Sequence, residues 1–467
     1  MGQRSQQDFR PATGPLRVSP ENPRYFADGS GRTVYLTGSH TWSNLRDMGK
    51  TDPPPAFDFD GYLDFLRHYN HNFIRMWTWE LTRYTYDGEW VHATPFPWQR
   101  AGPGRALDGK PRFDLSLLNQ AYFHRLRSRV VAAGERGIYV SIMLFEGHGL
   151  HASLVPWCWD GHPFNAHNNV NEIDGDPGRD GRGLETHTLQ IPAITSLQEA
   201  YVRRVIDTVN DLDNVLYEIA NESGAYSTEW QYHVIRYIHQ YEKTKPRQHP
   251  VGMTFQFARE DRGTNENLFN SPAEWISPSP DGGYRHDPPA AGGSKVILSD
   301  TDHLWGIGGN QAWVWKSFCR GLNPLFMDPY LEPRRKEAAG PQGEQRGTWT
   351  DHLSGRRARD RRWDPIRKSL GYTRTYAERM NLLATVPRGD LVSTQYCLAD
   401  PGIEYLVYLP EGGSVTVDLS VASVPLAVEW FDPSTGEPSP AGTTTGGAGR
   451  RFAAPFNGDA VLYIVVQ

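Results

Sequence analysis

The sequence has few cysteines and no long apolar run. The three cysteines, Cys158, Cys319 and Cys397, are widely spaced and form no C-x-x-C pair, which argues against a disulfide framework or a cysteine-based zinc site. No run of about 18 apolar residues occurs, so a transmembrane helix is not expected. Residues 1–16 are polar and lack the apolar centre of a signal peptide. We therefore expect a cytoplasmic protein, or a secreted one if a leader has been removed.

An excess of charge of one sign is also lacking. The 48 basic and 54 acidic residues leave a net charge of −6, whereas a nucleic-acid binder needs a basic face. We therefore expect no nucleic-acid partner, and no membrane partner because an apolar span is missing. The sequence leaves the oligomeric state open.

Aromatic residues, by contrast, are abundant: 15 Trp, 22 Tyr and 19 Phe in 467 residues. Aromatic side chains bury large areas in a core, and exposed ones present flat faces on which sugar rings stack. The composition alone leaves both uses open. The length suits one large domain with a smaller one.

Strand-like and helix-like segments alternate over the first 386 residues. After a hairpin at residues 17–36, apolar runs predict eight strands, at residues 34–37, 73–77, 138–145, 214–220, 250–257, 275–277, 295–299 and 324–327. Helical spacing appears at residues 57–69, 115–136, 196–213, 228–243 and 311–320, and Ser196 with Glu199 forms a capping box. This alternation predicts an α/β fold, a (β/α)8 TIM barrel over residues 1–386.

The pattern changes in residues 387–467. Short alternating segments lie at residues 392–399, 404–410, 414–420, 426–432, 450–456 and 460–466, separated by turn residues. They predict a small antiparallel β-sandwich. Three polar stretches within the barrel, residues 80–112, 146–195 and 332–364, predict long loops, and a loop of such length is usually functional.

Polar and aromatic side chains gather where the predicted strands end. These are His40, Trp42, Arg75, Trp77, Trp79, Glu80, Glu146, His148, Asn221, Glu222, Gln256, Asp300, Asp302, His303, Trp305 and Asp328. Functional groups of a barrel lie at the carboxyl ends of its strands. The sequence therefore predicts a binding site at that end.

Two carboxylates in this set have the spacing that glycosidic bond cleavage needs. Glu222 follows the fourth strand and Asp302 the seventh, so they face each other across the barrel. One carboxyl group protonates the leaving oxygen, and the other attacks the anomeric carbon or activates water. Their surroundings must keep one protonated and the other ionised.

These residues resemble the signature of glycoside hydrolase clan A. The Asn221–Glu222 pair is similar to the clan's acid/base motif, and the segment HNFIRMW resembles its strand-two arginine, which would make Arg75 a partner of the nucleophile. The chain most resembles the apiosidase-like (DUF4038) and family 5-like barrels. The segments EYLVYLPEGGSVTVDLS, VEWFDPSTGE and FAAPFNGDAVLYI resemble a C-terminal domain named for collagen binding. The resemblance implies a retaining glycosidase that needs no cofactor.

The seventh strand departs from the clan's pattern. It offers the segment SDTDH, with no glutamate to serve as nucleophile. Asp302 is the better match, with Asp300 in support, and the reverse assignment stays open. An aspartate is one methylene shorter, which widens the gap between the carboxylates and keeps inversion open beside retention.

The remaining polar residues have alternative roles. Asn221 binds a sugar hydroxyl by the resemblance, or caps the next helix. Several histidines, His40, His148, His151 and His167, fit no tight metal motif, so recognition of hydroxyl groups is favoured and no metal site is predicted. A Ca²⁺ loop formed by Asn171, Glu172, Asp174 and Asp176 is a minor alternative.

The leading hypothesis is therefore a glycoside hydrolase, exo-acting on a terminal sugar such as a pentofuranoside of a plant or microbial glycan. The long loops favour exo-action by closing the site, although they are equally able to line the groove of an endo-acting enzyme. Two further alternatives are an inactive carbohydrate-binding protein and a matrix-binding protein.

Overall fold

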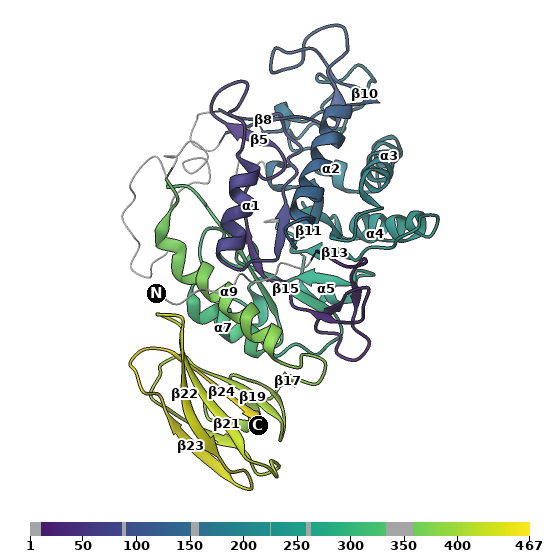
Figure 1. Cartoon of the computed structure of the whole chain (residues 1–467). Helices are drawn as coiled ribbons and strands as arrows, with labels where there is room; N and C mark the ends of the chain where they lie inside the picture. Colours follow the sequence, from purple (N-terminus) through teal and green to yellow (C-terminus); the bar gives the residue numbers. More distant parts are fainter. Residues whose placement is uncertain (1–10, 86–89, 151–157, 225, 258–262, 333–357) are drawn as a thin grey trace.

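The computed structural model describes residues 11–85, 90–150, 158–224, 226–257, 263–332 and 358–467. Its larger part is a ring of eight parallel strands surrounded by helices (Figure 1). Hydrogen-bonded neighbours run in the order β4, β16, β15, β14, β13, β12, β11 and β6, and β6 lies beside β4. The strands are Gly38–His40 (β4), Phe73–Met76 (β6), Tyr139–Glu146 (β11), Val215–Asn221 (β12), Val251–Thr254 (β13), Trp275–Ser277 (β14), Val296–Asp300 (β15) and Asn323–Met327 (β16). The predicted (β/α)8 barrel is confirmed.

Helices cover the outside of the ring. They are Phe59–His68 (α1), Gln120–Gly134 (α2), Pro192–Val209 (α3), Thr228–Glu242 (α4), Asn265–Asn270 (α5), Thr301–Trp305 (α6), Gln311–Cys319 (α7) and Asp364–Arg379 (α9). Local signals set where several of them begin. The Asp58 carboxylate accepts the N–H of Gly61 at the start of α1, and the Asn119 side chain accepts the N–H of Ala121 at the start of α2. Both contacts satisfy N–H groups that the helix itself leaves free.

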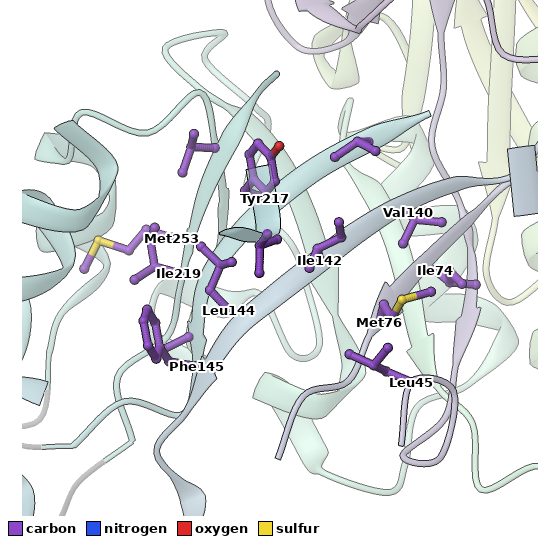
Figure 2. Packing of buried hydrophobic residues seen from close by; sticks show 14 of the residues in the cluster. Leu45, Ile74, Met76, Val140, Ile142, Leu144, Phe145, Tyr217, Ile219 and Met253 are labelled. Carbon is purple, nitrogen blue, oxygen red and sulfur yellow. The ribbon is translucent and has the colours of Figure 1, made fainter. Parts of the chain in front are cut away.

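Apolar side chains fill the space between the strands and the helices of the barrel (Figure 2). All residues of β11 and β12 are buried, including Ile142, Leu144 and Ile219. A strand covered on both faces reads as a continuous apolar run rather than an alternating one. This is why the sequence located these strands to within one or two residues.

The first barrel strand lies later than predicted. Thr33–Val34 (β3) pairs with Phe26–Ala27 (β2) in the predicted hairpin, and Arg17–Val18 (β1) adds a third strand. The Asp28 side chain accepts the N–H groups of Ser30 and Arg32 and so fixes this turn. The run from residue 34 to residue 37 therefore leaves the hairpin, and the barrel strand starts at Gly38.

Two helix boundaries also differ from the prediction. Residues 115–118 belong to strand Asp114–Leu118 (β10), and α2 begins after Asn119. The α3 helix begins at Pro192, so Ser196 and Glu199 lie inside it and form no capping box. Proline suits a first helical turn because its fixed φ is helical and no N–H is needed there. The α9 helix was not predicted, because polar residues separate the members of its buried face.

The loops after the first strands carry small elements of their own. Asp47–Gly49 (β5), Arg83–Thr85 (β7) and Trp90–Thr94 (β8) form a three-stranded sheet, and Trp98–Gln99 (β9) pairs with β10. Short 3-10 helices cover His148–Leu150, Cys158–Gly161, Leu184–His187, Asp281–Gly283, Arg361–Trp363 and Gly389–Leu391. The predicted loop at residues 332–364 lies largely outside the described residues.

The C-terminal part is an antiparallel β-sandwich, as predicted. One sheet has the order β17, β18, β19, β24, β21, β22, and the pair β20–β23 packs against it. The strands are Val386–Pro387 (β17), Cys397–Asp400 (β18), Glu404–Leu409 (β19), Ser414–Asp418 (β20), Leu426–Asp432 (β21), Glu437–Thr444 (β22), Gly449–Ala453 (β23) and Ala460–Val466 (β24). The β22 strand was not predicted because it is exposed almost throughout and lacks apolar alternation.

An aromatic cluster joins the two domains. Trp315 of α7 and Tyr376 of α9 contact Phe431 of β21, with ring centroids 5.8 and 5.4 Å apart. Tyr408 and Tyr463 extend the cluster on the sandwich side. Figure 1 shows the sandwich beneath α7 and α9. Within the described residues, no helix has both the length and the apolar character that a membrane span requires.

Candidate active site

The carboxyl ends of neighbouring barrel strands bring polar side chains together. His40 ends β4, Glu146 ends β11, Asn221 ends β12 and Asp300 ends β15, and all four are buried. Arg75, within β6, lies between them and contacts two of the four. The strand ends therefore meet in one polar cluster, where the sequence predicted a site.

Arg75 is the centre of this cluster and is completely buried. Its Nε and Nη2 donate to the two oxygens of Glu218, at 2.9 and 2.5 Å. Its Nη1 donates to both Asp300 and Asp302, at 2.9 and 3.0 Å, and Nη2 also donates to Asn221 Oδ1 at 2.7 Å. Burial alone would lower the pKa of Arg75, but the surrounding carboxylates raise it well above its usual value. The predicted contact between Arg75 and Asp302 is present.

Asp300 has its oxygens occupied by the protein itself. Oδ2 accepts from His40 Nε2 at 2.7 Å and from Arg75 at 2.9 Å, while Oδ1 accepts the backbone N–H of Asp302. Burial alone would raise the pKa of this carboxyl, but the His40 and Arg75 contacts hold it well below its usual range. Asp300 is therefore an ionised, enclosed anchor for Arg75 and for the start of α6.

A tryptophan fixes the tautomer of His40. The indole N–H of Trp77 donates to His40 Nδ1 at 2.8 Å. Because an indole nitrogen only donates, Nδ1 must be the unprotonated nitrogen and Nε2 must carry the hydrogen. His40 is thus a neutral donor to Asp300. Trp77 and His40, both predicted strand-end residues, therefore hold the Asp300 carboxylate in position.

Asp302 lies two residues further along and is held less tightly. Arg75 reaches its Oδ2, and about 5% of the side chain is exposed. Burial and the nearby Glu222 raise the pKa of Asp302 well above its ordinary value, against the opposing charge of Arg75. Two carboxyl groups that interact in this way do not both ionise easily. Asp302 and Glu222 are therefore suited to hold one proton between them at neutral pH.

Glu222 occupies a strained backbone position. Its φ of +44° lies in the left-handed region, which glutamate seldom adopts. A Cβ at Gly147 would lie 2.5 Å from the Glu222 carbonyl oxygen, so the chains after β11 and β12 approach closely at a point where only glycine fits. Strain of this kind costs about 1–3 kcal/mol and gathers at functional sites. It turns the Glu222 side chain toward His148, whose Nδ1 lies 2.8 Å from Oε2.

Glu146 and His148 form a second polar group beside Glu222. The backbone N–H of His148 donates to Glu146 Oε1, and the Tyr84 hydroxyl donates to Oε2 at 3.0 Å. Burial raises the pKa of Glu146 to about 8. Burial alone would lower the pKa of His148, but Glu222 raises it to about 9. At neutral pH Glu146 is therefore mainly protonated and His148 is a cation.

Asn221 and His303 complete the wall between strands four and seven. Asn221 Oδ1 accepts from Arg75 and lies 3.2 Å from His303 Nε2, and His303 Nδ1 lies 2.8 Å from the Ser277 hydroxyl. Burial lowers the pKa of His303 to about 3, so it is neutral. These contacts use the Asn221 oxygen and fix the orientation of its amide.

Gln256, by contrast, is engaged on both sides by the start of α4. Its Nε2 donates to the Ser227 hydroxyl at 2.7 Å, and its Oε1 accepts from the Thr228 hydroxyl at 3.1 Å. The structure thus joins Gln256 to the first turn of that helix.

The predicted tryptophans lie mostly in the core. Trp42, Trp77 and Trp79 are at most 3% exposed and pack with Met48 and Leu81. Trp305 is half-buried and packs edge-on against Trp313. Of the two uses that the composition left open, the structure therefore gives Trp42, Trp77 and Trp79 the packing one.

Sequence reasoning missed Glu218 and the role of Glu80. Glu218, within β12, accepts hydrogen bonds from Arg75. Its only mark in the sequence is that it is a charged residue within the apolar run VLYEIA. Glu80 lies 3.0 Å from His187 Nε2 and 3.5 Å from His162 Nε2. These contacts, led by His187, lower the pKa of Glu80 to about 2 although burial opposes them. Glu80 thus ties two parts of the predicted loop at residues 146–195 to the end of β6.

The alternative Ca²⁺ loop is built differently from a cation site. The Asp176 carboxylate accepts the N–H groups of Asp180 and Gly181, and Asp174 accepts the N–H of Asp176. These carboxylates serve as turn caps. Within the described ranges, no group of three or more His, Cys, Asp or Glu side chains is arranged to hold a metal ion.

Two families match parts of the sequence. The first is described as a domain of unknown function (DUF6298) and matches residues 79–261, from the end of β6 past β13. The second is described as "Putative collagen-binding domain of a collagenase" and matches residues 388–465. The second match confirms the resemblance predicted for the C-terminal segments. No protein with a curated description matches the sequence.

The fold is similar to those of solved glycoside hydrolases. One structure, titled "Glycoside hydrolase", is 14% identical with a TM-score of 0.58 and covers 97% of both chains. A glycoside hydrolase family 5 protein from Bacteroides vulgatus ATCC 8482 is also 14% identical, with a TM-score of 0.61, covering 97% of this chain and 93% of its own. At this identity the likeness establishes a shared fold along nearly the whole chain, sandwich included.

Proposed function

We propose that the protein is a glycoside hydrolase in which Glu222 is the acid/base and Asp302 the nucleophile. The observation that carries the proposal is the meeting of these two carboxyl groups from the ends of strands four and seven, where the charge of Glu222 raises the pKa of Asp302. A glycosidase needs one protonated and one ionised carboxyl group at the bond that it cleaves. Their separate contacts distinguish the two groups: the Arg75 cation favours the ionised form of Asp302, and Glu222 lies 2.8 Å from the protonated His148.

Asp302 is a better nucleophile than Asp300 on the same grounds. Asp300 accepts hydrogen bonds from His40, Arg75 and the backbone N–H of Asp302, and the residue has no exposed surface. Asp302 accepts one hydrogen bond from Arg75 and retains some exposure. Arg75 stabilises its carboxylate and later the departing ester oxygen, which is electrostatic assistance of the oxyanion kind.

We propose that the reaction retains the configuration of the anomeric carbon, because the chain resembles clan A. Asp302 attacks the anomeric carbon while Glu222 protonates the departing oxygen, and Glu222 then deprotonates the water that releases the sugar. The Asn221 amide, fixed through its oxygen, is assigned to a hydroxyl of the bound sugar. We also propose exo-action on a terminal sugar, with pentofuranosides as the first candidate substrates. This part rests on the resemblance and on the long loops anchored by Glu80.

The test begins with a screen of aryl glycosides, pentofuranosides included, and of plant and microbial polysaccharides. Proton NMR of the first product distinguishes retention from inversion. Glu222→Gln and Asp302→Asn are then compared with the parent protein. Because a general acid contributes about 10²–10⁴-fold, Glu222→Gln is expected to lose that much on poor leaving groups.

Azide separates the two roles. With Asp302→Gly, azide takes the place of the nucleophile and yields a glycosyl azide of inverted configuration. With Glu222→Gly, azide attacks the glycosyl-enzyme and yields a glycosyl azide of retained configuration. If neither replacement changes the turnover of any glycoside, the hydrolase proposal fails and an inactive sugar-binding protein becomes the better account.

A further inference from the structure

His148 contacts the Glu222 carboxyl group directly, which a histidine that only binds sugar hydroxyl groups would not need to do. His148 Nδ1 lies 2.8 Å from Glu222 Oε2, and each side chain is about 16% exposed. The histidine is held from its own backbone, because its N–H donates to Glu146 Oε1. Tyr84 holds that carboxyl group at its other oxygen. Glu222 therefore meets an imidazole whose position is set independently of any sugar.

An imidazole and a carboxyl group at this distance share a proton in one of two ways. The pair is either an imidazolium with a carboxylate or a neutral imidazole with a carboxylic acid. Both forms hold the same single proton, and they differ by its transfer across one hydrogen bond. The macroscopic pKa values of such a pair belong to both groups together.

We propose that His148 is a positioning residue for Glu222 that shares with it the proton delivered to the leaving-group oxygen. This inference rests on the proposed function of Glu222. As the glycosidic C–O bond breaks, the shared proton passes from His148 Nδ1 to Glu222 and from Glu222 to the departing oxygen, which leaves a neutral imidazole beside a carboxylate. When water completes the hydrolysis, its proton passes to Glu222 and back to His148, so the pair ends as it began.

The charged neighbours of the pair favour its singly protonated form. Glu146 faces His148 from the end of β11, and Asp302 faces it from α6. Glu80 and Tyr84 face Glu146 in turn. A cation between these groups offsets the repulsion between Glu222 and Asp302 before the bond breaks, and the neutral imidazole left afterwards accepts the proton that Glu222 takes from water. One histidine therefore serves both halves of the reaction.

The pH profile of His148→Asn tests the inference. Asparagine places a neutral N–H near the position of Nδ1, so the hydrogen bond survives without a transferable proton. The probe is a phenyl glycoside that the parent protein cleaves, and the alkaline limb of kcat/KM reports the acid group of the free enzyme. If the pair holds the proton, the limb of the parent lies near the His148 pKa of about 9, and His148→Asn moves it down by at least one pH unit.

The opposite result has an equally clear meaning. If Glu222 holds the proton alone, losing a neighbouring positive charge raises its pKa and moves the limb to higher pH. An upward shift, or none, overturns the proposal. His233→Asn is the matched control, because His233 lies 2.9 Å from Glu199 on the outer helices and its loss should leave the profile unchanged.

A titration of the histidines by ¹⁵N NMR gives a readout that needs no substrate. The His148 signal is assigned by its loss in His148→Asn. In Glu222→Gln the His148 pKa should fall below 7, while Glu199→Gln should leave it unchanged. An unaltered His148 titration in Glu222→Gln overturns the inference. If the parent cleaves no glycoside, the proposed function fails separately, and this titration alone decides whether the pair shares a proton.

Discussion

Asp300 caps the helix that carries Asp302: its Oδ1 accepts the backbone N–H of Asp302 at 3.0 Å. This contact fixes where α6 begins and therefore which way Asp302 projects. Two aspartates separated by one residue thus acquire different environments, one enclosed by donors and the other facing Glu222. The segment SDTDH does not by itself show which aspartate is the nucleophile. The different surroundings of Asp300 and Asp302 lead us to expect different roles for them.

Replacing each aspartate should separate those roles. Asp302→Asn is expected to lower kcat on the order of 10⁴-fold, because the nucleophile is lost, while the melting temperature stays within a few degrees. Asp300→Asn is expected to cost about 2 kcal/mol of unfolding free energy, because charge-assisted hydrogen bonds from Arg75 and His40 weaken. Kinetics and thermal unfolding of both variants provide the measurement. Equal losses of activity with equal stability would contradict this division.

Glu146 should make stability depend on pH. Its folded pKa of about 8 lies above the ordinary value of 4.5, so the native state binds the proton more tightly than the unfolded chain. The stabilisation is complete below pH 4.5 and is lost as the pH rises through 8, by a few kcal/mol. Glu146→Gln keeps the shape but has no proton to lose. Between pH 5 and pH 8.5 its melting temperature should fall less than that of the parent, and parallel curves would refute this.

The fold was predictable because its signals are local. A strand such as β11, buried on both faces, is an apolar run interrupted only at Ser141, and a charged residue, Glu146, ends it. For this reason Glu146, Asn221 and Asp300 were identified from position alone. Exposed or amphipathic elements gave weaker signals, and β22 and α9 were consequently missed.

The contacts within the site were not predictable in the same way. The fork from Arg75 to Glu218 joins strands 143 residues apart, and no local pattern pairs them. The tautomer of His40 follows from its contact with Trp77, which comes directly after a different strand. The strained φ of Glu222 follows from the close approach of Gly147. Each of these depends on how two distant segments pack, which periodicity does not report.

A buried ion pair should hold α9 against the last barrel strand. Arg367 donates to the two oxygens of Asp328 at 2.7 and 2.5 Å, and neither side chain is exposed. Arg367→Met leaves the Asp328 charge buried without its cation, which costs about 3–5 kcal/mol. The exposed pair of Arg388 and Asp390 is the matched control, and Arg388→Met should cost less than about 1 kcal/mol. Chemical denaturation measures both, and similar losses would refute the assignment.

The sandwich should stabilise the barrel through the aromatic cluster at Phe431. Phe431→Ala removes a buried ring from between Trp315 and Tyr376, which costs about 3–5 kcal/mol and should lower the unfolding temperature of the barrel. Phe452 packs against the sandwich core, so Phe452→Ala should weaken the sandwich and leave the barrel transition in place.

Deleting residues 387–467 is the stronger form of the same test. The deletion uncovers Trp315, Phe318 and Tyr376, which are buried in the complete chain. Apolar patches of this kind promote association between molecules, so the barrel alone should aggregate, as light scattering would detect. A soluble and active barrel would show that the sandwich serves something other than the stability of its neighbour.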